Sequence, residues 1–128
     1  MATAPPIVYT YKSCDTCRKA VKWLQANGIA FEERPIRETP PTVAEIHHVY
    51  AAVGDWAKLF NRSGRDYRAG DWKTRLPTLS DDEKASALAA NGNLIKRPFV
   101  VLPDGGGMVG FDEAAWAGAL GIPVDDVG

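Results

Sequence analysis

The two cysteines constrain this chain most, because they form a CDTC tetrapeptide at a strand-to-helix junction. Before them, the β-branched and aromatic run from Ile7 to Tyr11 is typical of a strand. After them, apolar residues recur on one helical face, namely Cys17, Ala20, Val21 and Leu24. Gly28 would end this helix, and Ile29 to Arg34 alternates as a second strand should. The opening therefore predicts a β-α-β unit with parallel strands and a right-handed crossover.

The predicted position of Cys14 gives it reactivity. A thiol at a helix N-terminus faces unpaired backbone N–H groups and the positive end of the helix dipole, and both favour the thiolate. Cys17 comes three residues later, on the next turn and the same side. It can attack a mixed disulfide formed at Cys14 and release the bound partner as a thiol. We therefore predict that Cys14 is a nucleophile and Cys17 its resolving cysteine.

Two other interpretations of the cysteine pair remain open: half of a zinc site, or two unreactive core residues. Structural zinc normally has four ligands, and the sequence contains no second cysteine pair. His47 and His48 are adjacent, so we expect them on different faces of a helix and not as metal ligands. We expect no metal site.

The middle of the chain predicts helices. Two capping-box signatures begin them, Thr42 with Glu45 and Ser80 with Glu83. Gly92 would close the second helix. The polar stretch 61–75 between the two signatures is typical of a structured loop. Trp56, Tyr67 and Trp72 are expected to pack in the core and not to stack on nucleic-acid bases.

The end of the chain predicts a hairpin and a last helix. Residues 99–102 (FVVL) and 108–111 (MVGF) flank a DGGG turn, and Asp112 would cap the helix. The whole order is β-α-β, a helical insertion, then β-β-α. We predict an α/β, thioredoxin-like fold with a four-stranded mixed sheet flanked by helices, in a single domain over residues 1–128.

Composition excludes several classes of function. A net charge of -1 gives no global attraction to nucleic acid or to an anionic membrane. The N-terminus lacks the apolar core of a signal peptide, and no apolar run approaches the roughly twenty residues that span a bilayer. We expect a cytoplasmic protein with reduced cysteines and neither nucleic acid nor membrane as a direct partner.

The Arg97-Pro98 step precedes the third predicted strand. In thioredoxin-like folds a cis proline at this place approaches the active cysteine. We therefore expect Pro98 to be cis and Arg97 to direct its guanidinium toward Cys14, where it would stabilise a thiolate or bind an anionic substrate. A surface arginine beside a proline that only begins a strand is the alternative.

Two more arginines are candidates for binding an anionic substrate. Arg18 follows Cys17 and could face the site or the solvent. Arg62 lies in the polar stretch together with Arg65, Tyr67 and Arg68. That segment could form one side of an anion-binding pocket, bind an acidic partner, or be a solvated loop without either role.

Three separated motifs resemble the arsenate reductase ArsC / Spx family: YKSCDTCRKAVKWL, KLFNRSGRDYR and LIKRPFVV, followed by VGF. The resemblance runs from Ile7 to about Leu120 and implies a thioredoxin-like sheet with a helical insertion. Cys14 matches the nucleophile of the family's arsenate reductases, and Arg62 and Arg97 match two of the three arginines that surround arsenate there. The third would fall in the hairpin, which reads GGGMVGF and has no basic residue.

The resemblance implies three candidate functions. One branch contains glutathione- and glutaredoxin-dependent arsenate reductases, and another contains glutathione-linked thiol reductases. In the Spx-like branch the cysteine pair is a redox switch on a transcriptional regulator that binds RNA polymerase, with the alpha subunit as the expected partner. The CxxC pair suits the second and third branches better. We predict first a thiol reductase without a bound cofactor, served by glutathione, glutaredoxin or another thiol protein, and second an Spx-like regulator.

Overall fold

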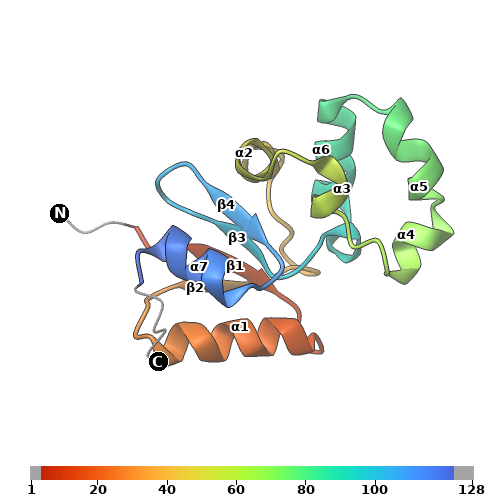
Figure 1. Cartoon of the computed structure of the whole chain (residues 1–128). Coiled ribbons are helices and arrows are strands. Elements are labelled where there is room, and N and C mark those ends of the chain that lie inside the picture. Colours follow the sequence, from red (N-terminus) through yellow and green to blue (C-terminus); the bar gives the residue numbers. More distant parts are fainter. Residues whose placement is uncertain (1–3, 123–128) are drawn as a thin grey trace.

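A four-stranded mixed sheet forms the centre of the molecule, in a computed structural model that describes residues 4–122 (Figure 1). The strands are β1 (Ile7–Thr10), β2 (Glu32–Pro35), β3 (Phe99–Val101) and β4 (Gly107–Val109), in the order β2-β1-β3-β4. β1 and β2 are parallel, as predicted, whereas β3 is antiparallel to both β1 and β4. β1, β2 and β4 therefore end, and β3 begins, at one end of the sheet. We call this the cysteine end, because Cys14 follows β1 there.

Each face of the sheet has its own apolar core, because side chains alternate along a strand. The helices over one face are α1 (Asp15–Ala26) and α7 (Glu113–Leu120), and α2 (Val43–Val53) covers the other (Figure 1). Val8 and Val100 pack toward the first face, and Tyr9 and Phe99 toward the second. Within residues 4–122 no helix is both long enough and apolar enough to span a membrane.

A helical insertion between β2 and β3 continues the second core (Figure 1). After α2 it comprises α3 (Trp56–Leu59), α4 (Arg65–Ala69), α5 (Trp72–Arg75) and α6 (Asp81–Ala90), with 3-10 turns at Leu76–Thr78 and Gly92–Leu94. The prediction of a loop over 61–75 was wrong, because this stretch contains α4 and α5. Tyr67 and Trp72 are buried against Phe60 and hold both short helices on the core, as tertiary packing often does for helices too short to be stable alone.

Two predicted boundaries also differ from the structure. β2 begins at Glu32, because Ile29 still belongs to the turn after α1 and donates its N–H to the Leu24 carbonyl at 3.0 Å. α6 ends before Gly92, which does not close it. Gly92 instead permits a close approach, since a Cβ atom there would lie 2.0 Å from the carbonyl oxygen of Ile36. This contact fixes the end of the insertion against the segment that follows β2.

The other predicted helix ends are confirmed. Thr42 and Ser80 each form a complete capping box, and Asp112 caps α7 by accepting from the N–H of Ala114 at 3.3 Å. Gly28 follows α1 with a φ of +66°, a conformation that favours glycine. The hairpin is also confirmed, although its strands are β3 at Phe99–Val101 and β4 at Gly107–Val109 where 99–102 and 108–111 were predicted.

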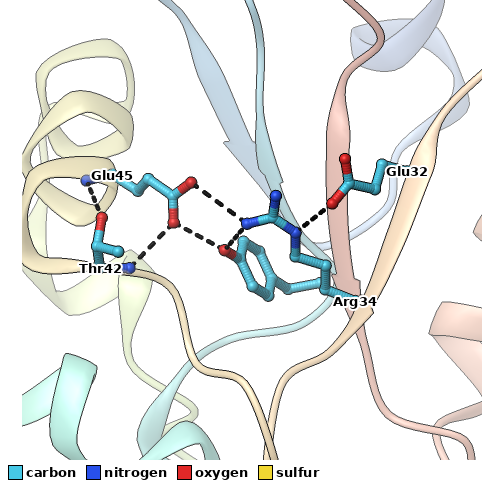
Figure 2. Close-up of polar contacts among 5 residues, drawn as sticks. Glu32, Arg34, Thr42 and Glu45 are labelled. Carbon is cyan, nitrogen blue, oxygen red and sulfur yellow. Dashed lines mark hydrogen bonds and ion pairs between the residues drawn. The ribbon is translucent and has the colours of Figure 1, made fainter.

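A polar network joins β1, β2 and the start of α2 (Figure 2). The buried Tyr9 hydroxyl donates to Glu45 Oε1 at 2.7 Å and accepts from Arg34 Nη1 at 3.0 Å. Arg34 also pairs with Glu32, and Glu45 completes the capping box with Thr42. Burial, and next the hydrogen bond to Glu45, raise the pKa of Tyr9 to about 12. The network therefore needs the neutral phenol.

We expect Tyr9→Phe to destabilise the protein by about 1–2 kcal/mol at neutral pH, because it removes the donor to Glu45 and the acceptor for Arg34. The folded state holds the phenol proton to a higher pH than the unfolded state, so this contribution is complete below pH 10 and is lost as the pH rises toward 12. Urea unfolding at neutral pH and at about pH 11 measures the difference between wild type and variant. Tyr50→Phe, outside the network, is the control. A stability difference between wild type and Tyr9→Phe that stays constant or grows as the pH rises would contradict the raised pKa of Tyr9.

Candidate active site

The Cys14 thiol lies at the N-terminus of α1, where it is itself the helix cap. Its backbone is extended, with φ −96° and ψ 114°, and its Sγ accepts a hydrogen bond from the Cys17 N–H at 3.2 Å. The turn before it is closed by the Cys14 N–H, which donates to the Tyr11 carbonyl at 3.0 Å. Cys14 is half-buried and a free thiol. A sulfur held by a helix N-terminal N–H can accept negative charge there.

Cys17 lies in the first turn of α1, three residues after Cys14, and differs from it in environment. Cys17 is 2% exposed, on the face of α1 that packs against the sheet. Burial, and next its hydrogen bond with Cys14, raise the pKa of the Cys17 thiol to about 12. The positive charge of Arg97 acts in the opposite direction but does not offset the burial. Cys17 is therefore a protonated, shielded thiol at neutral pH, in hydrogen-bond contact with Cys14.

The Arg97-Pro98 peptide bond is cis, as expected, and Pro98 is buried. The antiparallel register pairs Tyr9 with Phe99, which places Pro98 beside the end of β1. The guanidinium carbon of Arg97 lies 5.1 Å from the centroid of the Tyr11 ring. Arg97 Nη1 is buried without a hydrogen-bond partner among the described residues. Arg97 thus brings an uncompensated positive charge to the cysteine end of the sheet.

The two other predicted arginines lie differently. Arg18 donates to the Lys12 carbonyl at 2.7 Å and forms an ion pair with Asp15, and its side chain is about half exposed. Arg62 lines a basic pocket of about 500 Å³ at the cysteine end of the sheet, where β3 begins and β4 ends, together with Lys58, Phe60, Ser63, Lys96 and Val109. Neither arginine has a hydrogen bond or ion pair to Cys14, Cys17 or Arg97 within residues 4–122.

Tyr11 and Arg37 are neighbours of the site that sequence reasoning missed. Arg37 Nη1 donates to the Tyr11 hydroxyl at 2.7 Å, and its guanidinium carbon lies 4.9 Å from the ring centroid. A hydrogen bond from Ser13, and next the charge of Arg37, lower the pKa of Tyr11. The parallel register could have indicated this pair, because β1 and β2 end together and Arg37 follows β2 by two residues.

Metal binding finds no support in the described part of the chain. Within residues 4–122 no group of three or more His, Cys, Asp or Glu side chains is placed to hold a metal ion. His47 packs edge-on against Trp56, with ring centroids 6.0 Å apart. The cysteine pair therefore gains no further ligands there.

The site combines a capping thiol, a buried thiol one turn later, a cis proline and a nearby arginine at one end of a mixed sheet. This fold and site define a protein of the thioredoxin-like class. The sequence profile of the ArsC family matches residues 9–119, and the chain belongs to this family.

Three relatives show the range within the family. The uncharacterized protein YusI of Bacillus subtilis (strain 168) is 44% identical over 82% of this chain and 89% of its own. A possible arsenate reductase from Streptococcus mutans UA159, known from a crystal structure, is 36% identical in sequence to this chain. Its superposition covers 84% of this chain and 92% of that protein, with a TM-score of 0.79. The global transcriptional regulator Spx of Staphylococcus epidermidis is 28% identical over 83% of this chain and 79% of its own.

Proposed function

We propose that this protein is a cytoplasmic thiol–disulfide oxidoreductase, with Cys14 as nucleophile and Cys17 as resolving cysteine. The observation that carries the proposal is the contrast between the two thiols. Cys14 is accessible and capped by a helix N-terminal N–H, while Cys17 is buried, protonated and hydrogen-bonded to it. A nucleophile backed by a protected second thiol suits a two-step exchange.

The reaction would proceed as follows. The Cys14 thiolate attacks one sulfur of a substrate disulfide, forms a mixed disulfide and releases the first substrate thiolate. Cys17 then attacks Cys14 Sγ, its proton passes to the departing second thiolate, and a Cys14–Cys17 disulfide forms. The substrate gains two electrons and the cysteine pair loses two. Two molecules of glutathione, or one reduced glutaredoxin, would restore the dithiol by the reverse exchange.

The test is reduction of a small disulfide by glutathione, with glutathione reductase consuming NADPH as glutathione disulfide is formed. We expect turnover by the wild-type protein and accumulation of a mixed disulfide on Cys14 in Cys17→Ser, detected by intact-mass measurement. Absence of turnover, together with no mixed disulfide on Cys17→Ser, would contradict the proposal.

A second candidate function is an Spx-like redox-switched regulator that binds the alpha subunit of RNA polymerase. The observation that favours it is the Spx relative, which aligns with most of this chain. The cysteine pair would then change a docking surface when it oxidises, without turnover. Capture of the purified alpha subunit that changes on oxidation, with negligible disulfide reduction, would favour this function.

Arsenate reduction is third, because the hairpin from Gly105 to Phe111 contains no basic residue. Preorganised positive charge supplies much of the catalysis of oxyanion chemistry. Arsenate-dependent turnover with glutathione that is lost in Arg97→Gln would raise it above the other two.

A further inference from the structure

Two guanidinium groups converge on one aromatic ring at the cysteine end of the sheet. Arg97 approaches Tyr11 from the segment before β3, and Arg37 approaches it from the segment after β2, at 5.1 Å and 4.9 Å from the ring centroid. The backbone carbonyl of Tyr11 accepts a hydrogen bond from the Cys14 N–H. The ring is thus a platform that carries two positive charges beside the turn of the reactive thiol.

Among the described residues neither guanidinium is held in an ion pair, although the hydrogen bond from Asn91 and also the charge of Arg37 lower the pKa of Asp66. Within residues 4–122, Arg97 Nη1 is buried without a partner. Glu33 and Glu38 line the pocket that Tyr11 also lines, and Glu33 accepts a hydrogen bond from Thr10 Oγ1 at 2.6 Å. A buried guanidinium N–H without an acceptor is costly, so a ligand that supplies one is favoured there.

We infer that Arg37 and Arg97, whose guanidinium carbons lie 4.9 and 5.1 Å from the centroid of the Tyr11 ring, form an anion subsite for a carboxylate of the substrate that reacts at Cys14. The inference rests on the proposed function and narrows its substrate class to disulfides that carry a carboxylate close to the sulfur. Arg37 supplies the second guanidinium from the β2 side. Arg37 is solvent-exposed, so it can receive such a group without rearrangement of the core.

The test compares two alkylating reagents that share their leaving group and differ in charge, iodoacetate and iodoacetamide. Cys17 is buried and protonated at neutral pH, so Cys14 is the thiol expected to react, which peptide mass measurement checks. We expect Arg37→Gln to lower the ratio of the iodoacetate rate to the iodoacetamide rate by about fivefold at low salt. Arg37→Lys, which keeps the charge but not the planar donor pair, should lie between.

The control is Arg75→Gln. Arg75 also lies over an aromatic ring, with its guanidinium carbon 4.0 Å from the Trp72 centroid, but it belongs to α5 in the insertion. Arg75→Gln removes the same charge as Arg37→Gln and should leave the ratio of the iodoacetate rate to the iodoacetamide rate unchanged. An equal ratio in wild type and Arg37→Gln, or an equal fall in Arg75→Gln, would overturn the inference.

Alkylation requires no disulfide turnover, so the two hypotheses fail separately. A ratio that depends on Arg37, in a protein with neither glutathione-linked turnover nor a mixed disulfide on Cys17→Ser, would support the anion subsite and overturn the oxidoreductase. Glutathione-linked turnover with a reagent ratio that is the same in wild type and Arg37→Gln would support the oxidoreductase and overturn the anion subsite.

Discussion

Replacement of Cys14 by serine is expected to abolish disulfide reduction, with a loss of about three orders of magnitude or more in turnover, while the fold is retained. The hydroxyl cannot act as the thiol does in exchange. Serine is, however, among the preferred helix N-caps, so its oxygen can accept the Cys17 N–H in place of Sγ. The glutathione-coupled assay and urea unfolding measure the two effects.

Cys14→Ala separates the two roles of this residue. It should lose turnover to the same extent and, because no cap acceptor remains, also cost about 1 kcal/mol of stability relative to Cys14→Ser. Full turnover in Cys14→Ser would exclude Cys14 as the nucleophile. Equal stability of the serine and alanine variants would show that a side-chain acceptor at position 14 contributes nothing to the helix cap.

The largest effect on stability is expected from Trp116→Ala, at about 3–5 kcal/mol. Trp116 is 1% exposed in the core between the sheet, α1 and α7. Its ring meets Trp23 and Phe111 edge-on, with centroids 6.2 and 4.9 Å apart. Truncation would leave a cavity among these aromatic rings, and a typical domain has only about 5–15 kcal/mol to lose.

Trp116→Phe isolates the hydrogen bond from the packing. Trp116 Nε1 donates to the Gly110 carbonyl at 3.1 Å, at the end of the hairpin. Phenylalanine fills much of the space but leaves that carbonyl without its donor, so we expect a smaller loss of about 1–3 kcal/mol. The midpoints of urea unfolding measure the loss of stability in both variants, provided that the slope of the free energy against urea concentration is unchanged. A loss below about 1 kcal/mol in Trp116→Ala would contradict the description of this core.

Local signals predicted the parts of this protein that local physics controls. The capping boxes at Thr42 and Ser80 depend on hydrogen bonds across three residues, so the sequence displays them directly. The β-α-β opening follows from periodicity and the closing β-β-α from the hairpin pattern, and the likeness of this order to thioredoxin-like folds predicted the cis bond at Pro98. The roles assigned to Cys14, Cys17 and Arg97 remain predictions that the experiments above test.

Contacts between distant segments were decided by the tertiary structure alone. The polar stretch 61–75 contains helices because Tyr67 and Trp72 pack against Phe60. Position 92 requires glycine because a Cβ atom there would overlap the Ile36 carbonyl oxygen. Arg37 carries no local signal of function, and only the parallel pairing of β1 with β2 brings it onto Tyr11. The sequence by itself determined the reactive cysteine motif and the order of the strands and the longer helices, because both depend on neighbouring residues. The charges that surround the motif come from three separate segments, and only folding places them together.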